Sequence, residues 1–287
     1  MRSGFVSFVG RSGVGKSTLI NRMIGSKVSI TSPRKHTTRR PVRAVLQGED
    51  AQAVLVDTPG LISKGSALGA RMYSSARAEM ASADLVVMVV DASKKFSDGD
   101  HHLLAQVAKL SSPQMVVVNK IDKVSPMALI QYLAALSRIC EDVNVDPAGY
   151  FPVSAVSGSG VEELSSAVLS NLPEGAPYYP SDVVSDASEE EFLAELVREQ
   201  LLLHLREELP SQVACTVTEW SWPYVRCEIW VASPSQKGIV IGKKGSVLAS
   251  VGARVREQLH PGLYLDLIVK VKKDWYKSEA TLDDLRL

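Results

Sequence analysis

The feature that most constrains the fold is a glycine-rich stretch near the N-terminus, GRSGVGKS, residues 10–17. It directly follows the strand-like run FVSFV and opens the helix-like run STLINRMIG. In this context the glycines let several backbone amides face one phosphate chain, and the helix N-terminus adds its partial positive charge. Lys16 is then expected to reach the β and γ phosphates, and Ser17 to ligate Mg²⁺. The alternative is a glycine turn with an incidental lysine, which this flanking disfavours.

Short apolar runs alternate with amphipathic segments of helix length from the start of the chain to about residue 171. The strand-like runs are FVSFVG, RAVLQG, AVLVDT, DLVVMVV, QMVVVN and YFPVSA. Valine-rich runs that alternate with helices predict an α/β domain whose mostly parallel sheet is covered by helices on both faces. In such a domain we expect functional side chains at the carboxyl ends of the strands.

Composition excludes several other classes of protein. The 287 residues carry no net charge, so charge over the whole chain identifies no partner. The longest apolar run, residues 85–90, is too short to cross a bilayer, and the first strand begins too early for a signal sequence. The three cysteines show no CxxC spacing, which argues against a disulfide framework and a zinc site. The sequence therefore predicts a cytoplasmic protein.

A second element facing phosphate is expected where the run AVLVDTPG ends a strand at Asp57. A carboxylate there can hold Mg²⁺, directly or through a water, and the amide of Gly60 can contact a γ-phosphate. DTPG is also an ordinary turn, so it is the preceding P-loop that favours the phosphate role.

The base is expected to bind at NKID, residues 119–122, which ends the run MVVV. The carboxylate of Asp122 can accept two hydrogen bonds from the ring NH and exocyclic amine of guanine, an arrangement that adenine does not offer. Asn119 would brace the loop, and the stem of Lys120 would lie over the ring. Ser154 and Ala155 would offer a backbone amide to the guanine oxygen.

These four elements in this order, each at a strand end, resemble those of the TRAFAC-class GTPases. The resemblance implies GTP hydrolysis, with GTP or GDP as the nucleotide and Mg²⁺ as the metal. The implied nucleotide-binding residues are Gly10, Arg11, Ser12, Gly13, Val14, Gly15, Lys16, Ser17, Thr18, Asp57, Gly60, Asn119, Lys120, Asp122, Ser154 and Ala155.

The segment SITSPRKHTTRRPVRAVL, residues 29–46, is similar to the first switch of the Era-type GTPases. In that family the TS…TTR pattern supplies a threonine to the magnesium, which implies Thr38 as first choice and Thr37 as second. A solvated basic loop is the alternative. The implied metal ligands are Ser17, Thr38 and Asp57, and the implied catalytic residues are Lys16, Thr38 and Gly60.

Two positions of the resemblance bear on the rate of hydrolysis. Leu61 follows Gly60, so the glutamine that orients water in Ras-like proteins is absent, as in the Era pattern. Gly13 stands where that family usually has an asparagine, which in related GTPases helps to hold a potassium ion beside the phosphates. We therefore expect slow intrinsic hydrolysis with little or no dependence on potassium, and the sequence supplies no general base.

A second domain is predicted after a segment rich in proline and polar residues. We expect a P-loop GTPase domain over residues 1–171, a linker over 172–188 and a smaller α+β domain over 189–287. A helix capped by Ser188 and ending at Pro210 is followed by a hairpin, two helices and a final strand. This α-β-β-α-α-β order resembles the type II KH domain that follows the GTPase domain in the Era family.

The sequence GKKG, residues 242–245, lies between the two short helices, where KH domains clamp a nucleic-acid backbone. Residues 237–277 carry nine Lys or Arg against three acidic residues, so this end of a neutral chain is basic. A solvated helix face with a charged tail is the alternative. Ile239 and Ile241 either fill the core or line an apolar floor for a base. The candidate RNA-binding residues are Gly242, Lys243, Lys244, Gly245, Lys237, Ile239, Ile241 and Lys272.

The family resemblance implies a GTP-dependent switch that binds the 3′ region of 16S rRNA and assists assembly of the 30S ribosomal subunit, as a monomer. One alternative is a constitutive RNA-binding protein whose GTPase domain only holds GDP. Another is a signalling GTPase with weak peripheral association at the inner face of the cell membrane. The helix at residues 189–208 is the candidate membrane contact, and its acidic start disfavours anionic lipid.

Overall fold

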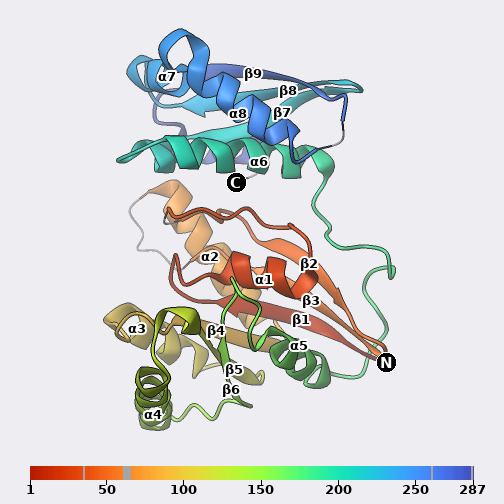
Figure 1. Cartoon of the computed structure of the whole chain (residues 1–287), viewed down its shortest axis with the longest axis vertical. Helices are drawn as coiled ribbons and strands as arrows, with labels where there is room; N and C mark the ends of the chain where they lie inside the picture. Colours follow the sequence, from red (N-terminus) through yellow and green to blue (C-terminus); the bar gives the residue numbers. More distant parts are fainter. Residues whose placement is uncertain (35, 61–65, 260, 286) are drawn as a thin grey trace. The chain divides into compact units, whose positions relative to one another are not determined.

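The computed structural model describes residues 1–34, 36–60, 66–259, 261–285 and 287 (Figure 1). Its contacts divide the chain into two compact units. Unit 1 comprises Met1–Ser29, Thr38–Ser63 and Met72–Asp186, and unit 2 comprises Ile30–Thr37, Lys64–Arg71 and Ala187–Leu287. Within the described residues, no helix is both long enough and apolar enough to cross a membrane.

Unit 1 is built on a six-stranded sheet in the order β2-β3-β1-β4-β5-β6. Only β2 and β3 pair in antiparallel fashion, and the other neighbours are parallel. This confirms the mostly parallel α/β fold. The strands are β1 (Arg2–Val9), β2 (Val42–Gln47), β3 (Ala51–Asp57), β4 (Leu85–Asp91), β5 (Gln114–Asn119) and β6 (Tyr150–Val153).

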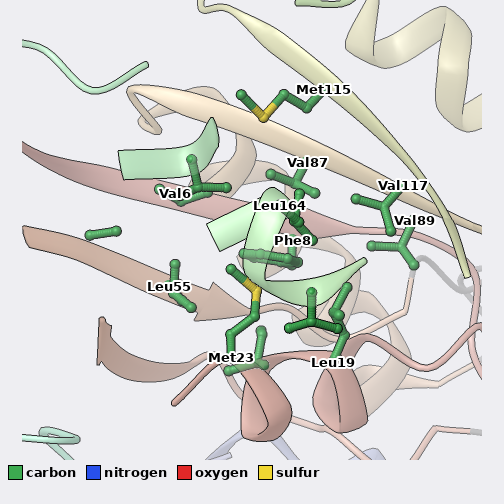
Figure 2. Packing of buried hydrophobic residues seen from close by; sticks show 14 of the residues in the cluster. Val6, Phe8, Leu19, Met23, Leu55, Val87, Val89, Met115, Val117 and Leu164 are labelled. Carbon is green, nitrogen blue, oxygen red and sulfur yellow. The ribbon is translucent and has the colours of Figure 1, made fainter. Parts of the chain in front are cut away.

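Helices cover both faces of this sheet because successive residues of the buried strands point to opposite sides. On one side, residues such as Phe8 and Val87 pack against α1 (Lys16–Ile24) and α5 (Val161–Ser170), as Figure 2 shows. On the other, alternate residues such as Met88 pack against three helices. These are α2 (Ala67–Ala81), α3 (Asp98–Val107) and α4 (Pro126–Asp142).

The segment 172–186, which we predicted as most of a linker, belongs to unit 1 and is hydrogen-bonded to strands of its sheet. The side chain of Gln52, 1% exposed, accepts hydrogen bonds from the amides of Tyr178 and Tyr179 and donates to the carbonyl of Tyr179. The amide of Val45 on β2 donates to the carbonyl of Val184. The proline-rich composition predicts the lack of regular structure here, but it gives no sign of these contacts.

Unit 2 contains a three-stranded sheet in the order β7-β8-β9, with β8 and β9 parallel. The strands are β7 (Ala214–Ser221), β8 (Tyr224–Val231) and β9 (Tyr264–Val271). Helices α6 (Glu189–His204), α7 (Pro234–Ile241) and α8 (Ser246–Arg256) share one apolar core with this sheet. The order α-β-β-α-α-β and the hairpin at Trp222-Pro223 are therefore confirmed.

Two details of unit 2 differ from the sequence prediction. Helix α6 ends at His204, because Leu205 is extended (φ −82°, ψ 152°) and Glu207 has a positive φ of 57°. A 3₁₀ turn, Leu209–Gln212, follows instead of further helix. In addition, the C-terminal tail forms a short helix, α9 (Glu279–Asp284), capped by the side chain of Ser278 and anchored by the buried Leu282.

Candidate functional site

The P-loop folds back on its own lysine. Lys16 is buried, and its Nζ donates hydrogen bonds to the carbonyls of Gly10 (3.0 Å) and Arg11 (3.4 Å). Burial lowers the pKa of Lys16, and this effect outweighs the attraction of the Asp57 carboxylate. Gly15 has φ +102°, and a Cβ there would lie 2.4 Å from the side-chain nitrogen of Asn119. Glycine is therefore required where the loop meets the base-binding segment.

Three oxygens from three separate segments of unit 1 gather at Asp57. Its Oδ2 accepts hydrogen bonds from Ser17 Oγ (2.7 Å) and Thr38 Oγ1 (3.1 Å), and these two hydroxyls lie 3.0 Å apart. Asp57 is fully buried and its Oδ1 has no hydrogen-bond partner among the described residues. A set of oxygen ligands with an unpaired buried carboxylate oxygen fits a hard cation such as Mg²⁺.

The pKa of Asp57 is raised by its burial. The attraction of Lys16 and the hydrogen bonds from Ser17 and Thr38 act in the opposite direction and only partly offset it. A buried carboxylate is costly to keep ionised without a compensating positive charge. The site is therefore arranged so that a bound cation would be stabilised strongly.

Gly60 lies directly against the P-loop. A Cβ at this position would come within 2.8 Å of the Ser12 amide nitrogen, so glycine is what allows the two backbones to approach. Thr58 helps to hold the turn, because its hydroxyl donates to the carbonyl of Phe8 at 2.6 Å. Within residues 58–72, which we expect to respond to the γ-phosphate together with residues 29–46, Leu61 and residues 62–65 lie outside the described residues.

Asn119 joins three loops at the ends of their strands. Its Nδ2 donates to the carbonyl of Val14 in the P-loop at 2.9 Å. Its Oδ1 accepts from the amides of Lys120 (2.8 Å) and Ala155 (3.1 Å). Because Asn119 is 1% exposed, these hydrogen bonds are shielded from water and fix the loops relative to one another.

Asp122 and Ser154 are brought together from two strand ends. The hydroxyl of Ser154, fully buried, donates to Asp122 Oδ1 at 2.6 Å and also accepts from the amide of Ser157. Asp122 itself is exposed, so its carboxylate is held at one oxygen and remains accessible. Such an orientation suits a carboxylate that accepts two hydrogen bonds from a base.

Two residues that the sequence did not single out also contact these loops. Arg22, in the last turn of α1, donates from Nε to the carbonyl of Ala155 at 3.2 Å and from its other end to the carbonyl of Val156. Asp91, at the end of β4, accepts from Lys120 Nζ at 2.7 Å. No short motif marks either residue, although the position of Asp91 at a strand end is a signal that could have been used.

In unit 2 the GKKG loop forms a tight turn between α7 and α8. Gly242 has φ +75° and ψ 171°, and a Cβ there would lie 2.5 Å from Val247 Cγ2. Gly245 has φ +79°, and Lys244 also adopts a positive φ, 52°. Lys243 and Lys244 belong to a 3₁₀ turn. The loop thus presents two exposed lysines between two half-buried glycines.

The other candidate RNA-binding residues have different environments. Ile239 is 57% exposed, so it does not fill the core, whereas Ile241 is partly buried against it. Lys237 is exposed. Lys272 is more engaged: its Nζ lies 4.7 Å from the centre of the Trp230 ring and 3.5 Å from Asp284.

Family models match both parts of the chain. A model described as "50S ribosome-binding GTPase" matches residues 5–120, and a KH domain model matches residues 223–276. Proteins named GTPase Era are 40% identical to this chain in a Nocardioides species, over 99% of this chain and 96% of that protein, and in Carboxydothermus hydrogenoformans, over 97% and 95%.

Two solved structures resemble this chain over almost its whole length. One is a single-residue variant of Era from Aquifex aeolicus bound to GDP and AlF4⁻, with a TM-score of 0.93, 33% identity and 99% coverage of both chains. The other is Era in complex with MgGDPNP and nucleotides 1506–1542 of 16S ribosomal RNA. Its TM-score is also 0.93, with 34% identity and coverage of 99% of this chain and 98% of that one.

Proposed function

This chain belongs to the Era family of GTPases, and from that premise we propose that it is a GTP-dependent switch acting on 16S rRNA. It is a GTPase of α/β fold with a C-terminal KH domain, and GTP, GDP and Mg²⁺ are its ligands. The observation that carries the proposed switch is the gathering of Ser17, Thr38 and Asp57, because Thr38 comes from a polar loop that a nucleotide can order.

The phosphates would be held by the P-loop. Its backbone amides, Gly10 to Thr18, would surround the chain of phosphates, and Lys16 would leave the carbonyls of Gly10 and Arg11 to reach the β and γ groups. Ser17, Thr38 and Asp57 would hold Mg²⁺, directly or through water. The bound cation would neutralise charge that develops on the phosphate oxygens.

Guanine would be selected by the second cluster. Asp122, oriented by the Ser154 hydroxyl, would accept hydrogen bonds from the ring NH and the exocyclic amine. The stem of Lys120 would lie over the ring, and the backbone amide of Ala155 would serve the guanine oxygen. Asn119 would hold the base-binding loops at a fixed position relative to the P-loop, since it is hydrogen-bonded to Val14 of the P-loop and to the amide of Ala155.

Hydrolysis would be slow without a partner. The amide of Gly60 would contact the γ-phosphate, and the loss of that phosphate would release the segments around Thr38 and Gly60. No side chain in the described part of the site is placed as a general base. Catalysis would therefore rest on positioning and on electrostatic stabilisation by Lys16 and the metal site.

RNA would bind at the GKKG loop of unit 2. The bare backbone at Gly242 and Gly245 permits the close approach of phosphate and ribose, and Lys243 and Lys244 supply positive charge. Ile239, exposed beside this loop, is suited to contact with a base. We place the target in the 3′ region of 16S rRNA, by analogy with the related complex, and the working site in the cytoplasm on the assembling 30S subunit.

The proposal is tested by measuring the binding of a labelled oligonucleotide that matches the 3′ end of 16S rRNA, with GDP and with a non-hydrolysable GTP analogue. Wild type should bind most tightly with the GTP analogue. The double variant Lys243→Asp/Lys244→Asp should lose binding in both states. The control Lys109→Asp/Arg138→Asp makes the same change of charge at exposed positions of unit 1 and should bind like wild type.

Each other outcome points to a different function. Tight binding that ignores the nucleotide would favour a constitutive RNA-binding protein whose GTPase unit only holds GDP. Absence of binding in every state would remove the ribosomal role. Sedimentation with anionic liposomes tests the alternative of peripheral membrane association, for which the acidic start of α6 is unfavourable.

A further inference from the structure

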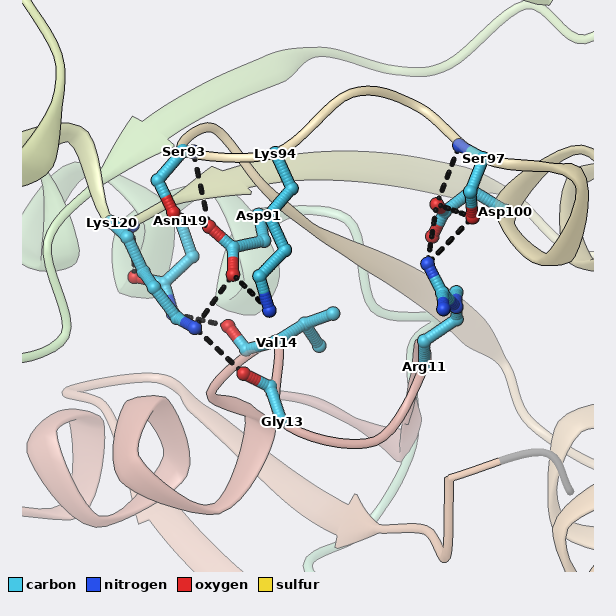
Figure 3. Close-up of polar contacts among 10 residues, drawn as sticks. All are labelled: Arg11, Gly13, Val14, Asp91, Ser93, Lys94, Ser97, Asp100, Asn119 and Lys120. Atoms are coloured by element: carbon cyan, nitrogen blue, oxygen red, sulfur yellow. Dashed lines mark hydrogen bonds and ion pairs between the residues drawn. The ribbon is translucent and has the colours of Figure 1, made fainter. Parts of the chain in front are cut away.

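We propose that the connection between β4 and α3, residues 91–100, is a positioning element that slows the release of guanine nucleotide by holding the P-loop at two points. Asp91 acts through Lys120 at one end of the connection, and Asp100 acts through Arg11 at the other (Figure 3). Neither carboxylate belongs to the motifs that the sequence identifies. The inference rests on the proposed nucleotide site.

At the first end, Asp91 fixes the lysine expected over the base. Asp91 is 6% exposed and lies beside Asn119, since the two residues are paired in the register of β4 and β5. Its Oδ2 accepts from Lys120 Nζ at 2.7 Å, and the same Nζ donates to the carbonyl of Gly13 at 2.7 Å. The lysine therefore links the carboxylate to the P-loop.

Asp91 is itself held in one orientation. Its Oδ1 accepts from both the amide (3.0 Å) and the hydroxyl (2.6 Å) of Ser93. Burial raises the pKa of Asp91, but the hydrogen bonds from Lys120 and Ser93 outweigh that effect and lower the pKa below the ordinary value. The carboxylate is thus ionised and fixed when it binds Lys120. Lys120 has a positive φ of 67°, a conformation that such anchoring helps to maintain.

At the second end, Arg11 of the P-loop reaches the N-terminus of α3. Its guanidinium donates to the hydroxyl of Ser97 at 2.6 Å and to Asp100 Oδ2 at 3.3 Å. Ser97 and Asp100 form the capping box of this helix, in which Asp100 Oδ2 accepts from the amide of Ser97 at 2.9 Å. Arg11 therefore binds two side chains that are already hydrogen-bonded to each other.

These contacts bear on nucleotide release because of where they meet the P-loop. Gly13 has a positive φ of 83° and open space around its Cβ position, so its own residue type gives the loop little rigidity. The loop is instead fixed from outside, at the backbone of Gly13 and the side chain of Arg11. A loop held in its binding conformation loses less entropy when phosphates bind, and the complex dissociates more slowly.

The test is the dissociation rate of a fluorescent GDP analogue from the full-length protein with Mg²⁺. Asp91→Asn and Asp100→Asn remove each charge while keeping an oxygen that can accept from Ser93 or Ser97. Each should speed dissociation roughly 3- to 30-fold. Arg11→Met should act like Asp100→Asn, and because Arg11 is 44% exposed it tests the second contact without a buried substitution.

Two matched controls isolate the contacts from general charge effects. Asp98→Asn removes a charge from the same connection, at an exposed side chain for which the described residues show no hydrogen bond or ion pair. Lys94→Met removes the other cation near Asp91: the Lys94 side chain is 66% exposed, its Nζ lies 3.6 Å from Asp91 Oδ2, and no hydrogen bond or ion pair joins it to the P-loop among the described residues. Both controls should dissociate GDP at the wild-type rate.

A double-mutant comparison separates positioning from a general loss of structure. If Asp91 acts through Lys120, then Asp91→Asn should have almost no further effect in a Lys120→Met background, and Asp100→Asn almost none in Arg11→Met. Additive effects in both pairs, or wild-type rates for both Asp variants with unchanged melting temperatures, would overturn the inference. Failure of wild type to bind GDP at all would instead overturn the proposed function.

Discussion

Gly13 shows how one residue sets the character of the P-loop. Its φ of 83° and the absence of any heavy atom within 4 Å of a Cβ at this position mean that asparagine could replace it without a clash. In the Era family an asparagine is usual here, and in related GTPases it helps to hold potassium. In this chain the carbonyl of Gly13 is bound to Lys120, and no side chain stands at that place.

Hydrolysis should therefore be almost insensitive to the monovalent cation. Exchanging sodium for potassium at constant ionic strength should change the GTP hydrolysis rate of wild type by less than about twofold, far below the roughly 10³–10⁵ that a cationic arginine finger supplies. Gly13→Asn should gain stimulation by potassium. Phosphate release measured in both salts decides the point, and strong stimulation of wild type would refute it.

Asp57 leads to a prediction about pH. Its pKa is raised by burial above the ordinary value of 3.8, so the folded protein binds more protons than the unfolded chain as the pH passes through the interval between these values. The contribution of Asp57 to the free energy of unfolding is most favourable below its unfolded-state pKa, where the carboxyl is neutral in both states. This contribution is lost as the pH rises through the folded-state pKa and the buried carboxyl ionises. The free energy of unfolding of nucleotide-free protein should thus improve for Asp57→Asn relative to wild type as the pH rises.

Guanidinium unfolding at several pH values between 4 and 7, with a chelator present, measures this difference. The same variant should lose the stabilisation that Mg²⁺ and GTP give to wild type. A difference between variant and wild type that does not change with pH would show that Asp57 has no raised pKa in the folded state.

At the residue scale, the sequence predicts those candidate site residues that belong to local motifs. It does not predict the residues that reach the site from distant parts of the chain. The P-loop, DTPG and NKID positions were named from local patterns, and the structure brings Ser17, Thr38 and Asp57 together. Arg22 and Asp91 were not named, because their partners lie 133 and 29 positions away. Such contacts depend on the order of strands in the sheet, which the alternation of strands and helices does not specify.

At the element scale, the GKKG turn depends on its two glycines to different degrees. A Cβ at Gly242 would lie 2.5 Å from Val247 Cγ2 and 2.8 Å from the Val247 nitrogen, and its φ and ψ are accessible to glycine alone. A Cβ at Gly245 would meet nothing within 4 Å, so only the positive φ opposes substitution there.

Gly242→Ala should therefore destabilise the protein by about 3 kcal/mol, from backbone strain and overlap together. Gly245→Ala should cost only about 1 kcal/mol. Chemical denaturation followed by the tryptophans, all of which lie at positions 220–275 in unit 2, compares the two variants. Equal losses would indicate that the turn rearranges to accept a side chain at Gly242.

The elements themselves were predicted well where hydrophobic periodicity decides them. All six strands of the first sheet and the α-β-β-α-α-β order were found from their patterns. The end of α6 was placed too late, because residues 205–209 continue a helical composition while Leu205 is extended in the structure. Helix α9 was missed because only six residues form it, and its stability comes from the burial of Leu282 and not from a periodic pattern.

At the scale of the whole molecule, the segment 172–186 is held within unit 1 by the buried side chain of Gln52 on β3. Gln52→Leu should leave the amides of Tyr178 and Tyr179 without these partners, at a cost of about 1–3 kcal/mol. Hydrogen exchange at these two amides should accelerate. Gln47 is exposed, accepts from Gln52 Nε2 at 3.3 Å and donates to the carbonyl of Pro180 at 3.4 Å. Gln47→Leu should therefore accelerate exchange at both amides less than Gln52→Leu does.

The proposed coupling between nucleotide and RNA must be reciprocal. If the GTP analogue tightens RNA binding by a certain factor relative to GDP, then RNA must favour the GTP analogue over GDP by the same factor, on the order of 5- to 150-fold for typical coupling. Titrating nucleotide with and without saturating oligonucleotide measures the second factor. Unequal factors would show that the measured species are not the four states of one binding cycle.

Unit 2 is not one continuous stretch of sequence, and this affects how it can be produced separately. Residues 30–37 belong to it: Ile30 lies in its core, and Glu199 of α6 accepts from the amide of Thr31 at 2.8 Å. Arg34 reaches the last turn of α6 through the carbonyl of Leu202. A gene fragment that starts at Ala187 would encode α6 without these contacts, and we expect it to be less soluble than a fusion that restores residues 30–37 through a flexible tether.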